Sequence, residues 1–151
     1  MENDLKRCAI IVADDDEGDR FLIHKAMKDC GVINEIQFLD DGQKLVDHLT
    51  ENLKLSVEKR ADLPCLILLD LNMPRLDGRE TLKIIKGNSQ LREIPIVILS
   101  NSKDPGDIRG SYKEGANSFF TKPLDYQNLV GLMNLLKIYW FQNAKLPYEK
   151  A

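Results

Sequence analysis

Polar side chains that could do chemistry come directly after short apolar runs of this 151-residue sequence. These residues are Asp14, Asp15, Asp70, Ser100 and Lys122. Carboxylates that lie close together repel one another unless protons or a cation come between them. Carboxylate oxygens, waters and a phosphoryl oxygen are the ligands that Mg²⁺ prefers in proteins. The acids Asp14, Asp15 and Asp70 therefore predict a divalent-cation site, with Mg²⁺ or Mn²⁺ as the expected ion.

Asp70 is the candidate for covalent chemistry. It follows a wholly apolar run, where an unpaired charge would be costly. A carboxylate can act as a nucleophile and form an aspartyl phosphate. The hydroxyl of Ser100 and the ammonium of Lys122 are suitable donors to the oxygens of a phosphoryl group. The pattern thus predicts phosphorylation of Asp70, whereas Asp16 and Glu17 are expected to cap the following helix.

Short apolar runs alternate with amphipathic stretches along the chain. The runs are Cys8–Ala13, Ile36–Leu39, Cys65–Leu69, Ile96–Leu99 and Asn117–Thr121. Two of them lack polar alternation, which is typical of strands buried on both faces of a parallel sheet. The order predicts an α/β fold, a doubly wound (βα)5 sheet with helices on both faces. Ligands of such sheets bind beyond the carboxyl ends of the strands, where the polar residues named above would meet.

The stretches between the runs carry helix signals. Asp77 has capping-box spacing to Glu80, and Asp104 precedes a proline suited to a first helical turn. The last and strongest stripe consists of Leu129, Leu132, Met133, Leu136 and Trp140. Residues 51–63 predict a helix end and a long loop, and residues 146–151 a tail. The second run is placed at the sheet edge, so the acids after it are expected to be turn residues.

Composition excludes several classes of protein. The 21 basic and 24 acidic residues give a net charge of −3, which argues against a nucleic-acid or anionic-membrane binder. No apolar run approaches the roughly 20 residues of a membrane span, and the acidic N-terminus is unlike a signal peptide. Cys8, Cys30 and Cys65 are predicted to be unpaired apolar residues of a reducing cytoplasm.

With these residues in this order, the sequence resembles the receiver domain of two-component response regulators. The resemblance covers about residues 8–140 and rests on Asp14-Asp15, Leu68–Pro74, Asp77-Gly78, Ser100, Gly115-Ala116 and Lys122-Pro123. It implies the flavodoxin-like receiver fold as one domain over residues 1–151, with a C-terminal extension from residue 141 and no output domain. It also implies a cis peptide bond between Lys122 and Pro123.

The resemblance assigns a role to each matching residue. Asp15 would bind the metal directly, Asp14 mainly through water, and Asn72 through its backbone carbonyl. Asp70 would be both metal ligand and phosphoacceptor. Two further residues, Ser100 and Lys122, would hold the phosphoryl group. Phe119 would be the switch aromatic that moves with the hydroxyl residue of the fourth strand, or else a plain core ring.

A narrower resemblance links the chain to the stand-alone regulators of cyanobacterial phytochrome histidine kinases. It rests on residues 51–63, 104–122 and 139–147, with departures at Phe141 and at Ala144-Lys145. It implies a phytochrome-type histidine kinase as partner. It also implies a homodimer through the fourth helix, fifth strand and fifth helix, with Tyr139, Trp140 or Phe141 contacting the second copy. A tail folded over its own domain is the alternative.

The leading hypothesis is a signalling switch that acts on no metabolite and catalyses only its own phosphorylation and dephosphorylation. One alternative is a phosphatase of the haloacid dehalogenase type, which needs a second acid two residues after its nucleophile. Asn72 stands there instead and cannot protonate a leaving group. The other alternative is a receiver-like binding module that works without phosphorylation.

Overall fold

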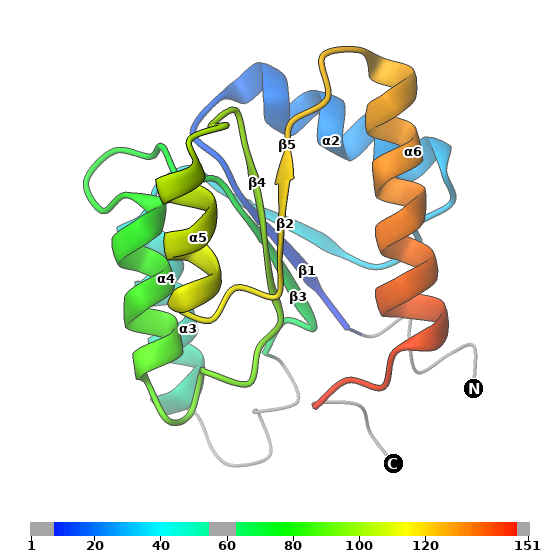
Figure 1. Cartoon of the computed structure of the whole chain (residues 1–151). Coiled ribbons are helices and arrows are strands. Elements are labelled where there is room, and N and C mark those ends of the chain that lie inside the picture. The colour runs from blue at the N-terminus through cyan, green and yellow to red at the C-terminus, as the bar shows by residue number, and fades with distance from the viewer. Residues whose placement is uncertain (1–7, 55–62, 148–151) are drawn as a thin grey trace.

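Five parallel strands form one sheet in the computed structural model, which describes residues 8–54 and 63–147 (Figure 1). The strands are β1 (Ile10–Ala13), β2 (Ile36–Leu39), β3 (Leu66–Leu69), β4 (Ile96–Ser100) and β5 (Ser118–Thr121). Their order is β2-β1-β3-β4-β5, which confirms the doubly wound topology and the edge position of the second strand. The chain adds β2 on one side of β1 and the later strands on the other side. This reversal of strand order between β1 and β3 creates the crevice at which ligands of such sheets bind.

Helices follow the strands in sequence and cover both faces of the sheet (Figure 1). They are α2 (Glu17–Asp29), α3 (Gly42–Lys54), α4 (Gly78–Gly87), α5 (Pro105–Lys113), α6 (Tyr126–Leu136) and the π-helix η2 (Lys137–Asn143). Asp16, Asp77 and Asp104 cap α2, α4 and α5 as predicted, whereas Glu17 is the first residue of its helix. Within the described ranges, no helix is both long and apolar enough to cross a membrane.

Alternate residues of β1 point to opposite sides of the sheet and fill two separate cores. Ile10 and Val12 pack with residues of α2 and α6. Ile11 and Ala13 pack with residues of α3 and α4. The central strands β1, β3 and β4 are buried along their whole length, which agrees with their unbroken apolar runs.

The segment after α6 differs from the predicted continuous α-helical stripe. In η2 the N–H of Ala144 donates to the carbonyl of Tyr139, five residues earlier, which is the π-helical spacing. Phe141 is buried there, whereas Trp140 is only partly buried and Tyr139 is 59% exposed. Leu146 also reaches the core, so this part of the tail covers its own domain. Of the three consecutive aromatic rings, Tyr139 is therefore the one left most open to solvent.

Two predictions about the covalent chain are wrong. Cys8 and Cys65 form a disulfide, with Cα atoms 5.5 Å apart, because they precede the neighbouring parallel strands β1 and β3 despite a separation of 57 residues. Cys30 is free, as predicted. No cis peptide bond occurs in the described residues. The Lys122 ammonium reaches Asp70 through a trans Lys122–Pro123 bond, so no cis bond is needed to aim it.

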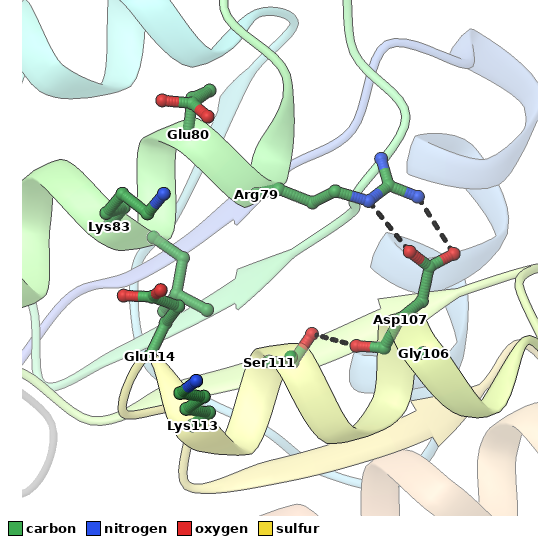
Figure 2. Close-up of a pocket in the computed structure, with 10 residues that line it drawn as sticks. Arg79, Glu80, Lys83, Gly106, Asp107, Ser111, Lys113 and Glu114 are labelled. Atoms are coloured by element: carbon green, nitrogen blue, oxygen red, sulfur yellow. Dashed lines mark hydrogen bonds and ion pairs between the residues drawn. The ribbon is translucent and has the colours of Figure 1, made fainter.

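Between α4 and α5 lies an open cavity of about 250 Å³ (Figure 2). Arg79 of α4 crosses its rim to Asp107 of α5, with two parallel N–H···O bonds of 2.8 and 2.9 Å. The Ser102 hydroxyl donates to the same carboxylate at 2.6 Å. These contacts join the two helices to the loop that follows β4. They could not be predicted from the sequence, since the two ion-pair partners are 28 residues apart.

Candidate functional site

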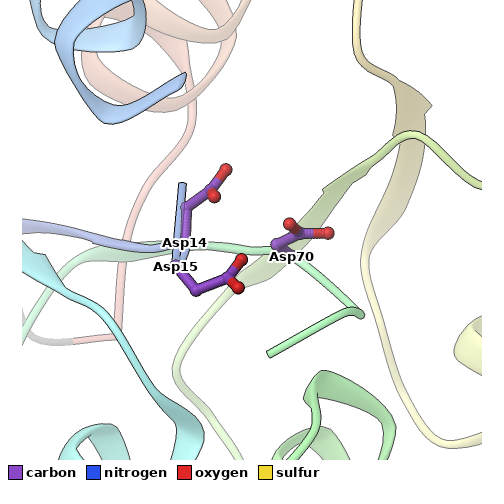
Figure 3. Close-up of side chains that lie close together, drawn as sticks. All are labelled: Asp14, Asp15 and Asp70. Carbon is purple, nitrogen blue, oxygen red and sulfur yellow. The ribbon is translucent and has the colours of Figure 1, made fainter. Parts of the chain in front are cut away.

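The acids at the ends of β1 and β3 meet at one edge of the sheet (Figure 3). Asp14, Asp15 and Asp70 each offer an oxygen within 4.8 Å of the others. Ala13 of β1 is paired with Leu69 of β3, so the residues after them emerge side by side. The cluster therefore follows directly from the parallel register, as the sequence predicted.

Burial distinguishes the three acids. Asp14 and Asp70 are 2% and 6% exposed, whereas Asp15 is exposed to solvent. Burial raises the pKa of Asp14 above its ordinary value, although hydrogen bonds from Lys122 and from the Asp16 backbone act in the opposite direction. Asp14 is thus held in a place where a positive neighbour is needed to keep it ionised.

That positive neighbour is Lys122, which follows β5 and whose side chain is 9% exposed. Its ammonium lies 2.7 Å from Asp14, 3.1 Å from Asp70 and 2.7 Å from Asp19. Burial alone would lower the pKa of Lys122, but the hydrogen bonds that its ammonium donates to Asp14 and Asp19 raise it above its ordinary value. The ammonium therefore stays charged beside the candidate phosphoacceptor.

The donor set fits a hard divalent cation. The Lys122 ammonium contacts the carboxylates of Asp14, Asp19 and Asp70. Asp15 adds a fourth carboxylate to the cluster, so the site has an excess of negative charge. All candidate ligands are oxygens, and the exposed Asp15 leaves one side open to water and to a phosphoryl oxygen. These are the features of a Mg²⁺ or Mn²⁺ site that retains several waters.

The loop after Asp70 is closed tightly against the start of α4. The Gly78 N–H donates to the Leu71 carbonyl at 2.8 Å. A Cβ atom at Gly78 would lie 2.0 Å from the carbonyl oxygen of Asp70, so only glycine fits. Asn72 is exposed, and its N–H points to an oxygen of the Asp70 carboxylate at 3.4 Å. The helix following the acceptor segment is thus in direct backbone contact with Asp70.

Ser100 and Phe119 lie on neighbouring strands at the same end of the sheet. Ser100 is fully buried, and its hydroxyl accepts the N–H of Ser102 at 3.2 Å. Phe119 is paired with Ile98, two residues before Ser100, which places both on the same face of the sheet. Phe119 is half-buried, and its N–H donates to the Tyr112 hydroxyl at 3.2 Å. This arrangement puts the two residues on one face of the sheet, and it is compatible both with a switch aromatic and with a core ring.

Sequence reasoning missed Asp19 as part of this site. It lies in the first turn of α2, where an acidic residue is explained by the helix dipole alone. No spacing to Lys122, 103 residues later, reveals the 2.7 Å contact. Only the three-dimensional packing of α2 against the end of β5 brings them together.

Comparison with known proteins decides the family. Residues 10–134 match the model of the response regulator receiver domain. The chain belongs to this family. Its sheet order and helices are those of the flavodoxin-like receiver fold, as the sequence predicted.

Relatives of this chain carry names that describe different regulatory roles. The chain is 34% identical over 138 residues to the "Probable methanogenesis regulatory protein FilR2" of Methanothrix harundinacea, covering 91% of this chain and 86% of that protein. It is 32% identical to the response regulator Rcp1 of a Synechocystis strain, covering 91% and 92%. A crystal structure of Rcp1 is described as its Mn²⁺-bound form and has a TM-score of 0.77 to this chain.

A third relative is the cyanobacterial phytochrome response regulator RcpA, whose crystal structure is described as phosphorylated. It is 33% identical, covers 93% of this chain and 99% of its own, and has a TM-score of 0.80. The predicted likeness to phytochrome-associated regulators is therefore confirmed. Family membership makes a histidine kinase the expected partner of this receiver domain.

Proposed function

We propose that this protein is a phosphorylation-dependent signalling switch in which Asp70 accepts a phosphoryl group from a phosphohistidine of a histidine kinase. The observation that carries the proposal is the meeting of three carboxylates with the buried ammonium of Lys122, 3.1 Å from Asp70. A nucleophile, a cation site and a fixed donor are thereby combined within one cluster. Each is a part that phosphoryl transfer needs.

Asp70 acts as the nucleophile in this proposal. One of its carboxylate oxygens forms a bond to phosphorus while the phosphorus–nitrogen bond to the kinase histidine breaks, and the imidazole nitrogen retains that electron pair. Lys122 and Ser100 donate hydrogen bonds to oxygens of the transferred group. A bound Mg²⁺ or Mn²⁺ supplies charge stabilisation for the phosphoryl oxygens. Its ligands would be Asp14, Asp15 and Asp70, with the Asn72 backbone carbonyl.

The same residues argue against the two alternative functions. A haloacid dehalogenase-type phosphatase needs a protonatable acid at position 72, and the amide of Asn72 cannot take that role. A binding module that works without phosphorylation would have no need of a buried carboxylate beside a buried ammonium. Burying such an ion pair costs desolvation free energy, so its presence favours a chemical role. We infer a switch whose only chemistry is its own phosphorylation and hydrolysis. Receiver-domain regulators are typically switches of this kind.

We assign the kinase to the phytochrome type, because RcpA is named as a phytochrome response regulator. We also propose that the exchange takes place in the cytoplasm, where a disulfide such as Cys8–Cys65 is unusual. The docking surface of the kinase on this chain is the apolar rim beside Lys122. Leu22 and Pro123 border a small hollow next to the ammonium, and Phe21 and Leu124 are 65% and 100% exposed. A partner must approach this edge of the sheet to reach Asp70, and large exposed apolar side chains favour protein contacts.

We further propose a homodimer through α5, β5, α6 and the C-terminal extension. Leu135 of α6 and Ile138 and Tyr139 of η2 are 54%, 41% and 59% exposed, so large apolar side chains are left exposed where the two helices join. Tyr139 is the ring expected at the interface, since Phe141 is buried in its own core. Sedimentation of Tyr139→Ser at micromolar concentrations should give a lower mass than the unaltered chain. Equal monomeric masses for both, phosphorylated or not, would overturn the dimer.

Intact-mass measurement tests the proposed switch directly. With Mg²⁺ and a small phosphodonor such as acetyl phosphate, the chain should gain one phosphoryl group, and Asp70→Asn should gain none. Asp47→Asn, the same change at an exposed position of α3, is the matched control and should behave as the unaltered chain. A chain that gains no phosphoryl group, or gains it equally in Asp70→Asn, contradicts the proposal.

A further inference from the structure

Asp19 is a partner of Lys122 that the proposed phosphoryl transfer has not used. Its carboxylate lies 2.7 Å from the ammonium, as close as that of Asp14 and closer than that of Asp70. The Asp19 N–H donates to the capping carboxylate of Asp16 at 2.8 Å. The cap fixes the first turn of α2 and therefore the direction from which Asp19 reaches the lysine.

The other two acids in contact with Lys122 have a second use in the proposed reaction. Asp14 belongs to the cluster of three carboxylates whose oxygens lie within 4.8 Å of one another, and so does Asp70. A cation would engage the first, and a phosphoryl group would esterify the second. Asp19 is outside that cluster. Among the described residues, it is the carboxylate partner that Lys122 would keep throughout the reaction.

A lysine at this position needs such a fixed partner. Its ammonium ends a flexible four-carbon stem, and the stem borders a hollow of about 40 Å³ that Leu22, Ile23, Leu99 and Leu129 also line. Apolar surroundings disfavour the charge and give the ammonium no direction. The Asp19 side chain is 34% exposed, so it can carry its own charge at little cost while orienting the lysine.

We propose that Asp19 is a positioning residue for phosphoryl transfer. It holds the Lys122 ammonium at the edge of β5 so that the ammonium meets an oxygen of the phosphoryl group on Asp70. This inference rests on the proposed phosphorylation of Asp70. The opposite role would give the opposite result. If the Asp19 carboxylate competed with the phosphoryl group for Lys122, it would slow the transfer, and removing its charge would accelerate phosphorylation.

Phosphorylation kinetics of Asp19→Asn separate the two roles. The variant keeps the side-chain shape but loses the charge. With acetyl phosphate and saturating Mg²⁺, we expect the maximal rate to fall about tenfold. This is less than the roughly 100-fold cost of a fully misplaced group, because Asp14 still contacts the Lys122 ammonium. The half-saturating concentration of Mg²⁺ should stay unchanged, because Asp19 lies outside the metal cluster. Asp19→Glu restores the charge from a longer stem and should recover part of the rate.

Glu17→Gln is the matched control. Glu17 lies two residues earlier in the same turn and is exposed, so its variant makes the same charge change and should leave the rate unaltered. An unchanged or raised rate in Asp19→Asn overturns the positioning role, and so does a weakened Mg²⁺ affinity. If the unaltered chain gains a phosphoryl group on Asp70 while Asp19→Asn gains it equally fast, only this inference fails. If the unaltered chain gains none, the proposed function itself fails.

Discussion

The neighbouring helices α4 and α5 lie on the same side of the sheet but are held there by different forces. α4 buries Gly78, Thr81, Leu82 and Ile85 against the core. α5 buries Ser111 alone. Apolar burial is non-directional and strong, so α4 is fixed as part of the core, whereas α5 depends on individual polar contacts.

Those polar contacts connect α5 to the candidate phosphoryl site. Arg79 holds Asp107 at one end of the helix, and Tyr112 accepts the N–H of Phe119 at the other. Ser102 contacts both the Asp107 carboxylate and the Ser100 hydroxyl. A change at Ser100 can therefore reach α5 through two residues without disturbing the core. The difference between the helices shows which element of this fold is easiest to reposition.

The largest expected effect is on the helix that the core holds. Leu82→Ala removes a side chain that is 1% exposed and should lower the free energy of unfolding by about 2–5 kcal/mol. Ser111→Ala, at the buried position of α5, loses one hydrogen bond to the Asp107 carbonyl and should cost about 1 kcal/mol. Urea denaturation measures both. Equal losses of unfolding free energy in the two variants would contradict the claim that the core holds α4 more firmly than α5.

A smaller effect is expected from Arg79→Ala. The ion pair with Asp107 is bidentate, but the Arg79 side chain is 42% exposed, so global stability should change by at most about 1 kcal/mol. Hydrogen exchange of α5 amides should nevertheless rise relative to those of α4. Lys83→Ala is the control, since Lys83 lines the same cavity one turn further along α4. Equal exchange in both variants would show that the ion pair does not hold α5.

The smallest effect is expected from mild acid. Hydrogen bonds from Arg79 and Ser102 lower the pKa of Asp107 to about 2, from its ordinary value of 3.8. A depressed folded-state pKa stabilises the folded form above the unfolded-state pKa, and that stabilisation is lost as pH falls from about 4 through 2. Exchange protection of α5, corrected for intrinsic rates, should thus stay constant from neutral pH to about pH 4. Loss of protection already near pH 5 would assign the restraint to another group.

The sequence was sufficient to predict the acid cluster because strand ends and strand order follow from apolar patterning. Asp14 and Asp70 each come directly after a buried run, and a parallel sheet brings the carboxyl ends of its strands to one edge. Lys122 was predicted for the same reason. These residues could be placed because the backbone alone determines where they emerge.

Contacts made by side chains on helices could not be predicted in this way. Asp19 lies in the first turn of α2, where the helix dipole favours an acidic residue whether or not a tertiary partner exists. Arg79 lies in the first turn of α4, where the dipole disfavours a cation, but nothing in the sequence identifies Asp107 as its partner. The spacing of Cys8 and Cys65 did not reveal their disulfide, because 57 residues separate them and only the pairing of β1 with β3 brings them together. Hydrophobic periodicity gives the inner face of a helix but says nothing about the partner of a charge on its outer face.

The π-helical spacing of η2 has a consequence for the length of this segment. Leu136 closes the buried stripe of α6, and a straight α-helix would bring residue 140 to the same face next. Because a π-helix has more residues per turn, Phe141 faces the core in place of residue 140. Deleting one residue from 137–143 would restore the α-helical phase and turn the Phe141 ring away from the core. The number of residues in this stretch is therefore constrained as strictly as the identity of its buried ring, and natural variation here should change side chains far more readily than chain length.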